Sequence, residues 1–191
     1  MDILNVEKRN EMIKAKKLKK SGMVPGCVYG GNLKETMLVQ IQEREANKLL
    51  KYKTKGGTLI LECEGKKHSV LLKEIDCNPV TDQINNLSFQ KLVEDEKVAS
   101  VAQIVLLNQN KITNLVLKLL HEIPYKAMPS DLIEKVEIDL ENMQAGTQLK
   151  VKDLPIYQNQ DIEILLDVDE MVLNVVENTK KQQLSQVEET V

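Results

Sequence analysis

The chain has 191 residues, of which 42% are hydrophobic and 29% are charged, and its formal net charge is −3. This is the composition of a globular protein; no secretory leader is recognisable, and the longest apolar stretches, near Val105 and Val116, are too short to span a membrane, so we expect a cytoplasmic protein. The three cysteines form no C-x-x-C pair, which argues against a disulfide framework and a structural zinc site.

Charge is distributed unevenly along the chain. Residues 1–90 hold 16 Lys and Arg against 11 Asp and Glu, a net charge of +5, and residues 91–191 hold the remaining 10 and 18, a net charge of −8. We therefore predict a basic domain over residues 1–92 and an acidic domain over residues 93–177, joined near the acidic run 94–96. Residues 178–191 are polar without periodicity, and we expect them to be disordered.

Hydrophobic periodicity in the first half predicts a small barrel. Strands are expected over 3–6, 24–29, 37–41, 58–63, 68–76 and 84–89, with helices over 10–20 and 42–53. One Phe and no Trp leave Val, Ile and Leu to build the core, which favours strands. These elements predict a six-stranded β-barrel with two or three helices.

The second half predicts strands and little helix. Strands are expected over 98–107, 115–123, 135–140, 148–151 and 171–176, and a single short helix over 130–135. The predicted fold class is therefore mainly β: an N-terminal barrel followed by an all-β C-terminal domain with one short helix.

The segment from Ala15 to Gly31 carries the clearest functional signal. A cationic helical turn with four lysines, suited to binding phosphates, precedes a short apolar strand that ends in Tyr29, a group able to stack on a base or donate a hydrogen bond. Gly30 and Gly31 then allow the backbone to turn or to approach a partner closely. The pattern suggests RNA binding, although a basic run is more often only the solvated face of a helix.

Catalytic motifs are nearly absent from the sequence. His68 and His121 occur in no metal-ligand spacing, and the S-x-x-K pattern of residues 88–91 lacks the partner motifs that give it meaning. Asp167 and Asp169, two residues apart on a strand, describe one solvated face. We find no glycine-rich phosphate loop, and we expect no enzymatic activity, no cofactor and no metal site.

The order of motifs resembles that of the bacterial large-subunit ribosomal proteins that bind 5S rRNA, in particular their two-domain Ctc general-stress type. The similar positions are Arg9, residues 15–20, Gly22, residues 25–26 and 28–30, residues 72–76 with Pro79, residues 86–89 where the family has His-x-Asp-Phe, and in the second half residues 128–133 and 136–140, Gly146 and residues 151–155. Each motif alone is weak, but their order is specific, and the resemblance covers residues 1–177.

The resemblance implies a barrel domain that docks on the loop E region of 5S rRNA, within the central protuberance of the large ribosomal subunit. It also implies the RNA-binding residues, which are Arg9, Lys14, Lys16, Lys17, Lys19 and Lys20 on phosphates, Tyr29 at a strand end, Lys73 at a groove-reading position, and Asn86 and Ser88 in place of the family's His and Asp. Because bare RNA repels an acidic domain, we expect the C-terminal domain to face neighbouring ribosomal proteins or solvent.

These features predict a structural ribosomal protein that takes part in translation and binds rRNA. Asn86 keeps the donor and acceptor capacity of a histidine in a shorter side chain, whereas Ser88 keeps less of an aspartate. Their weaker readout leaves an alternative open, namely a stress-related interaction protein that retains the fold and acts through protein partners. Persistence of the chain on large subunits at high salt would favour the ribosomal interpretation.

Overall fold

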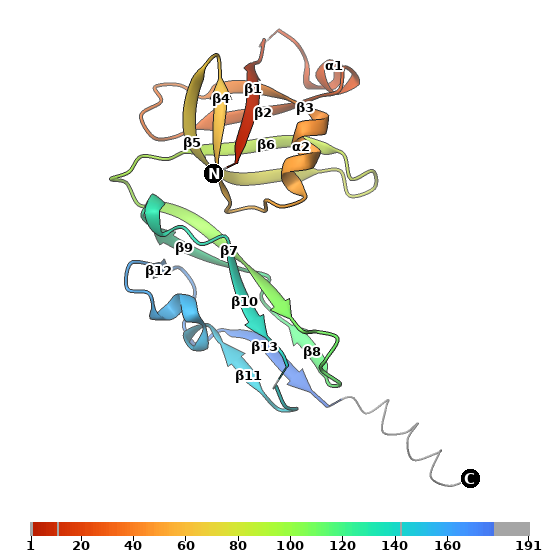
Figure 1. Cartoon of the computed structure of the whole chain (residues 1–191), viewed down its shortest axis with the longest axis vertical. Helices are drawn as coiled ribbons and strands as arrows, with labels where there is room; N and C mark the ends of the chain where they lie inside the picture. The colour runs from red at the N-terminus through yellow and green to blue at the C-terminus, as the bar shows by residue number, and fades with distance from the viewer. Residues whose placement is uncertain (1, 11, 142, 178–191) are drawn as a thin grey trace, which may run out of the picture. The chain divides into compact units, whose positions relative to one another are not determined.

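A computed structural model describes residues 2–10, 12–141 and 143–177 (Figure 1). The tail predicted to be disordered, 178–191, lies outside the described residues. The chain divides into two compact units, and we call residues 1–102 with 126–134 the barrel unit and residues 103–125 with 135–191 the second unit. The barrel unit thus takes in segments from beyond residue 92, and the domain boundary at 92–93 stays a prediction.

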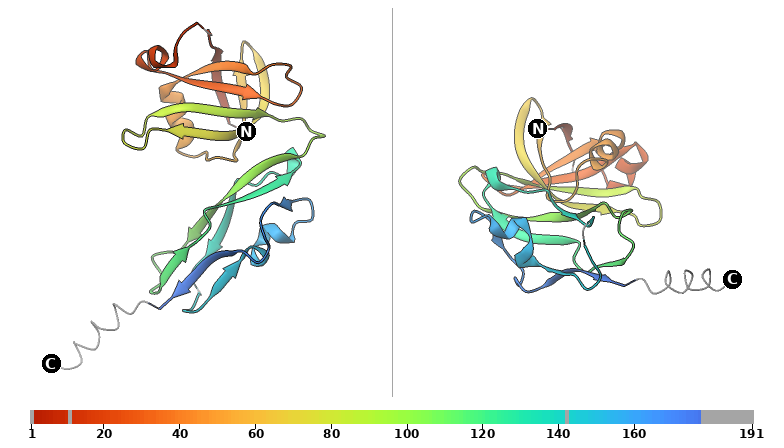
Figure 2. Two further views of the ribbon diagram at one scale, coloured as in Figure 1. Left: turned by 180° about the vertical axis from the view of Figure 1, so that it is seen from behind. Right: turned by 60° about the horizontal axis from the view of Figure 1, so that its bottom comes forward.

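The barrel unit is built on a closed six-stranded barrel in the order β1-β3-β2-β6-β5-β4. The strands are β1 (Ile3–Lys8), β2 (Met23–Tyr29), β3 (Met37–Gln42), β4 (Thr58–Cys63), β5 (Lys66–Cys77) and β6 (Ile84–Lys91). Strand β1 pairs with β4, and β2 with β6, in parallel; the other neighbours are antiparallel, and Figure 2 shows β5 beside β6 from behind. Alternate side chains such as Val28, Leu61 and Phe89 fill the interior, and the predicted barrel is confirmed.

Two helices flank the barrel, and both are shorter than the sequence predicted. Helix α2 (Glu43–Leu50) packs Ala46 and Leu49 into the barrel core. Helix α1 (Ala15–Lys20) begins five residues later than expected, so the predicted helix over 10–20 is wrong in its first part. There the Asn10 side chain accepts a hydrogen bond from the Met12 amide at 2.9 Å, a local turn that competes with helix formation.

The outer side of β5 is covered near Leu71 by chain segments that follow the barrel. Leu71, between the inward-facing Val70 and Leu72, points outward and is nevertheless fully buried. Gly56 has a φ of +90°, and a Cβ there would collide with the carbonyl oxygen of Val101, so the backbones approach closely. Residues 98–102 therefore form part of the wall around this side of the barrel.

An ion pair fixes the second covering segment, residues 126–134. The Lys53 Nζ lies 3.0 Å from Glu134 Oε2, and the Thr54 backbone amide donates to Glu134 Oε1 at 3.2 Å. Both side chains of the ion pair are largely buried, at 16% and 24% exposed. Because the carboxylate is satisfied by two donors of the barrel, residues near 134 are held firmly against it.

The second unit contains two sheets. One has the order β10-β7-β9-β12 and the other the order β11-β13-β8. The strands are β7 (Val98–Leu107), β8 (Leu115–Lys118), β9 (Glu122–Ala127), β10 (Lys135–Asp139), β11 (Gln148–Lys150), β12 (Glu163–Ile164) and β13 (Met171–Val176), of which β7 and β9 extend into the barrel unit. Tyr125 on one sheet and Leu173 on the other are fully buried.

Two predictions for the second half need correction, and three short elements were not predicted. The strand expected over 115–123 is two strands in different sheets, because the amides of Leu119 and Leu120 both donate to Val172 O and end the pairing of β8 with β13. The helix expected over 130–135 is only a 3-10 turn (Pro129–Asp131), after which Lys135 starts β10. Two further 3-10 turns (Val151–Asp153 and Pro155–Gln158) and β12 were not predicted.

Candidate nucleic-acid interface

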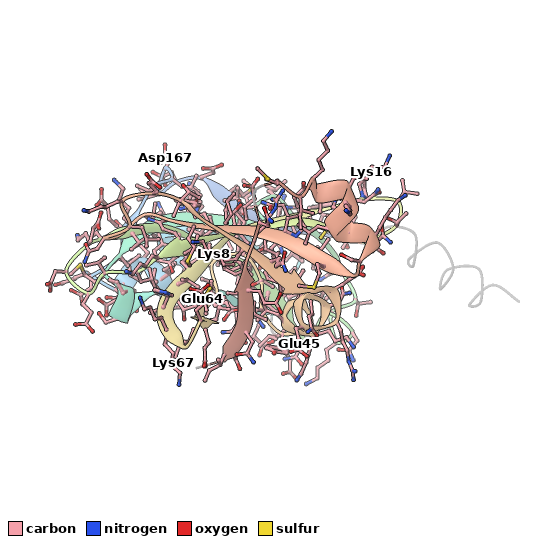
Figure 3. All side chains as sticks on the ribbon, turned by 90° about the horizontal axis from the view of Figure 1, so that it is seen from above. Lys8, Lys16, Glu45, Glu64, Lys67 and Asp167 are labelled. Atoms are coloured by element: carbon pink, nitrogen blue, oxygen red, sulfur yellow. The ribbon has the colours of Figure 1, made fainter. Side chains whose placement is uncertain are left out.

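Helix α1 presents a cluster of lysines, which we call the α1 lysines: Lys14, Lys16, Lys17, Lys19 and Lys20, all of them exposed. The helix is anchored by Leu18, which is buried, and its last-turn lysines complement the helix dipole. Within the described residues, none of the α1 lysines forms an ion pair. Figure 3 shows Lys16 on the far side of the barrel from the β4–β5 hairpin that carries Glu64 and Lys67. The cluster is thus a surface of unneutralised positive charge.

A chain of hydrogen bonds joins α1 to the adjacent ends of β5 and β6. Lys19 Nζ donates to Asn85 Oδ1 at 2.5 Å, and Asn85 Nδ2 donates to Asp76 Oδ1 at 3.4 Å. Among the residues that the structure describes, Lys19 therefore already has a side-chain partner, whereas the other α1 lysines have none. The contact makes the helix and the start of β6 one continuous surface.

The outer face of β2 and β6 carries the polar residues predicted from the sequence. The parallel register sets Cys27 beside Ser88 and Tyr29 beside Gln90. Because side chains alternate along a strand, these four share one side, and Val28, Leu87 and Phe89 fill the barrel on the other. Tyr29 lies on β2, Asn86 and Ser88 lie on β6, and α1, which contacts β2, carries Lys16, Lys17, Lys19 and Lys20. We call this combined surface the α1–β6 face.

The environment of Tyr29 disfavours ionisation of its phenol. Burial raises the pKa of Tyr29, and the nearby Cys27 and Glu74 raise it further because negative charge disfavours a phenolate. Gly30 and Gly31 follow with φ values of +79° and +55°, which confirms that the chain turns there. Tyr29 therefore ends its strand beside a sharp turn, with its hydroxyl available as a hydrogen-bond donor.

Acidic residues occupy the next strand of the same face. Glu74 opposes Ser88 and Asp76 opposes Asn86 across the β5–β6 pair, and both carboxylates are exposed. Phosphates are repelled near these groups, whereas the amino groups of bases can donate to carboxylates. The geometry thus separates a phosphate-attracting region on α1 from a base-compatible region on β2, β6 and β5.

Two of the predicted residues have other partners in the structure. Arg9 Nη2 donates to Ile13 O at 3.0 Å and so supports the loop that leads into α1. Lys73 lies at a bulge in β5, and its Nζ donates to Ala99 O at 2.6 Å on the covered side of the barrel. Burial, with the charge of Lys55, lowers the pKa of Lys73. The structure does not bring Lys73 to the α1–β6 face.

Cys27, Asn85 and Gln90 belong to this face but were missed by sequence reasoning. Cys27 and Gln90 come to it only through the parallel pairing of β2 with β6, strands separated by more than fifty residues. Asn85, next to the predicted Asn86, was detectable only through its contact with Lys19. Neither of the two long-range relationships has a local sequence signal.

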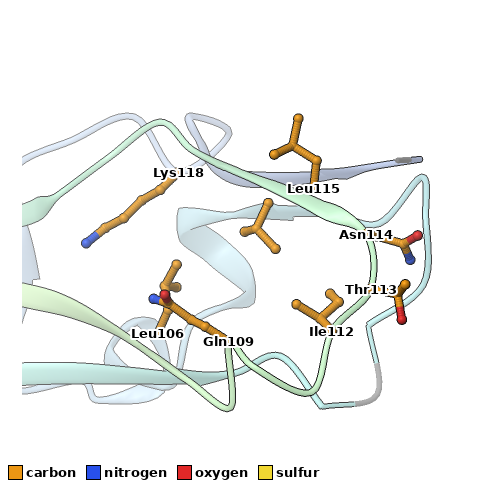
Figure 4. A pocket seen from close by; sticks show the side chains of 8 residues that line it. Leu106, Gln109, Ile112, Thr113, Asn114, Leu115 and Lys118 are labelled. Carbon is orange, nitrogen blue, oxygen red and sulfur yellow. The ribbon is translucent and has the colours of Figure 1, made fainter. Parts of the chain in front are cut away.

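The part of the chain that the structure describes offers little support for a site of another kind. It contains no cluster of three metal-ligating side chains and no helix with the length and hydrophobicity that crossing a bilayer requires. A pocket of about 550 Å³ at the β7–β8 turn (Figure 4) is lined by Leu106, Gln109, Ile112, Thr113, Asn114, Leu115, Val116 and Lys118. This lining has no His, Cys, Asp or Glu, and Lys118 Nζ donates to Ile104 O at 2.7 Å.

Residues 4–89 match the family model of the ribosomal L25p family, and residues 93–179 match that of the C-terminal domain of ribosomal protein TL5. Several similar proteins are named large ribosomal subunit protein bL25. That of Chlorobium phaeovibrioides is 30% identical over 165 residues, 85% of this chain and 81% of the relative. That of Nitrosomonas europaea is 28% identical over 167 residues, 82% of each chain.

A relative from Finegoldia magna extends the similarity to 91% of this chain and 84% of its own length, at 25% identity over 179 residues. The similarity therefore spans both halves of the chain, as the two family models do. Together with the closed barrel, these matches show that the chain belongs to the ribosomal L25p family in its two-domain form, as a structural ribosomal protein and not an enzyme.

Proposed function

We propose that this protein binds 5S rRNA, at the loop E region within the central protuberance of the large ribosomal subunit, through the α1–β6 face. The observation that carries the proposal is the continuity of that face: unpaired lysines on α1 are linked through Lys19 and Asn85 to the polar ends of β5 and β6. One surface thus offers both a phosphate-binding and a base-reading region.

The lysines supply the part of the affinity that is independent of sequence. Each ammonium that neutralises a phosphate releases counterions, and the binding constant then falls with rising salt concentration. Lys14, Lys16, Lys17 and Lys20 have no side-chain partner in the described parts of the chain and can take this role, whereas Lys19 is partly engaged by Asn85. We expect a slope of log K against log salt of about −3, from four contacts at the coefficients for single and double strands.

Tyr29 and Asn86 supply the discrimination between RNAs. Proteins read RNA sequence mainly where bases are unstacked or the helix is irregular, by aromatic stacking and hydrogen bonds to base edges. Both residues are half-buried, so their accessible parts are held in place by the strands around them. Their neighbours Glu74 and Asp76 keep phosphates away from this region.

The second unit is proposed to face neighbouring ribosomal proteins or solvent. It holds 7 basic against 13 acidic residues, a net charge of −6, whereas the barrel unit holds 19 against 16, a net charge of +3. RNA repels a surface of that sign. The names of the relatives support a ribosomal role over that of a stress-related interaction protein. The expected location is the cytoplasm, where ribosomes act.

A titration tests this proposal. The full chain is titrated with 5S rRNA and with an unrelated structured RNA of equal length, at several salt concentrations. Tighter binding to 5S rRNA, with a slope near −3, is the expected result. Equal affinity for both RNAs, or an affinity independent of salt, would overturn the assignment to 5S rRNA.

A further inference from the structure

Ser88 is buried although it lies on the α1–β6 face. It is only 7% exposed, while Asn86, two residues earlier on the same side of β6, is half-buried. The strands β2 and β5 flank it with Cys27 on one side and Glu74 on the other. A side chain so enclosed has little surface left for direct contact with a base.

The hydroxyl of Ser88 receives two hydrogen bonds from its neighbours. Asn86 Nδ2 donates to Ser88 Oγ at 3.2 Å, and Cys27 Sγ donates to the same oxygen at 3.6 Å, within the longer reach of sulfur. A hydroxyl oxygen has two acceptor positions, so both are filled. The three side chains form a network that spans β2 and β6.

This network leaves the Asn86 amide with a defined orientation. One N–H of Nδ2 points to Ser88, so the second N–H and the carbonyl oxygen Oδ1 are left on the accessible side. Oδ1 has no partner in the described part of the chain. Without a fixed neighbour, the amide of an asparagine can rotate and exchange the positions of donor and acceptor, because its terminal torsion is soft.

We propose that Ser88 is a positioning residue for RNA recognition, which acts by holding the Asn86 amide so that it presents an acceptor beside a donor. The fitting ligand is a base edge that offers a donor beside an acceptor, the arrangement that an asparagine amide can bind with two hydrogen bonds. Cys27 assists by filling the other acceptor position of the serine. The inference rests on the proposed function, because it requires Asn86 to contact RNA.

A double-mutant cycle on the full chain tests this inference. The variants Asn86→Ala, Ser88→Ala and the double variant are compared with the wild type by the ratio of their affinities for 5S rRNA and an unrelated structured RNA. We expect Ser88→Ala to reduce this ratio about 5- to 10-fold, within the range of one lost base contact. The double variant should lose no more than Asn86→Ala alone, because a positioning residue has no effect once its target is gone.

Two controls separate positioning from folding. Ser100→Ala removes the other buried serine of the barrel unit, which is 5% exposed and belongs to residues 98–102, and it should leave the ratio unchanged. Ser88→Thr keeps the hydroxyl and should restore most of the discrimination. In the free protein, NMR should show one Asn86 side-chain N–H exchanging slowly in the wild type and faster in Ser88→Ala.

Each remaining outcome overturns a stated claim. If the wild type discriminates and the losses of the two single variants multiply in the double variant, Ser88 acts independently and the inference is wrong. It is also wrong if Ser100→Ala lowers the ratio equally, or if Asn86→Ala has no effect. If the wild type fails to discriminate between the two RNAs, the proposed function itself is wrong, and the inference falls with it.

Discussion

Two outer sides of the same barrel differ in their accessibility to solvent. Over β2 and β6, Tyr29 and Asn86 stay partly accessible next to the α1 lysines. Over the middle of β5, Leu71 is fully buried, and Lys73 is bonded to Ala99 O of residues 98–102. Strand alternation sends side chains outward in both places, so outward direction alone does not define a binding surface. Whether a side of the barrel is available for binding depends on whether a later segment of the chain covers it.

The largest effect should come from the free lysines. Replacing Lys14, Lys16, Lys17 and Lys20 together with Ala should weaken binding to 5S rRNA and to unrelated RNA alike, by about 10²- to 10³-fold at physiological salt, since phosphate contacts carry no sequence information. Titration of both RNAs measures this. Lys48, Lys51, Lys66 and Lys67, also exposed and equal in charge, are the matched control and should matter little. An equal loss in the control would mean that binding depends on positive charge anywhere on the barrel unit and not on the α1–β6 face.

Tyr29 tests the proposed base-reading part of the α1–β6 face. Tyr29→Ala should lower affinity for 5S rRNA by about 5- to 100-fold, the range for loss of one stacked base, and affinity for unrelated RNA by much less. Tyr52→Ala, at a tyrosine that is 47% exposed after α2, serves as control and should change neither affinity. Unchanged discrimination in Tyr29→Ala would mean that Tyr29 only packs the strand end.

Glu134 tests the covered side. Glu134→Ala should lower the free energy of unfolding of the barrel unit by about 1–3 kcal/mol, because it removes the acceptor of Lys53 and of the Thr54 amide where both are largely buried. RNA affinity should be unchanged. Urea unfolding of the full chain provides the measurement, and Glu141→Ala, which breaks the exposed pair with Lys111, should have almost no effect.

The smallest predicted effect is the change in RNA affinity at Lys73, which lies on the covered side of the barrel. Lys73→Met removes the same charge as a single substitution on α1, yet should change RNA affinity less than about 2-fold, because its ammonium is bonded to Ala99 O. A single change at Lys16 should cost about 4- to 6-fold at physiological salt. Equal losses at both positions in parallel titrations would place Lys73 in the RNA interface after all.

Much of the barrel could be predicted from the sequence, because alternation of Val, Ile and Leu identifies strands locally. The break between β8 and β9 could not, since apolar residues recur along 115–123 with no Gly or Pro to mark a turn, and only the hydrogen bonds to Val172 O divide the run. The start of α1 was misplaced because a side-chain turn at Asn10 outweighed helix propensity.

For the candidate site, the sequence identified residue types but not their roles. The α1 lysines follow from a local run, and their exposure agrees with that pattern. The burial of Ser88 depends on the register of β2 against β6, and the bond of Lys73 depends on where residues 98–102 return. Both are long-range facts, and single-sequence patterns contain no information on them.

The central claim is that RNA occupies the α1–β6 face and leaves the rest of the barrel free. Lysine labelling of the full chain, with and without 5S rRNA, measures this residue by residue when followed by mass spectrometry. We predict protection of Lys16, Lys17 and Lys20 on RNA binding, with the labelling of Lys66 and Lys67 unchanged. Protection of Lys66 and Lys67 with α1 still fully labelled would contradict the account.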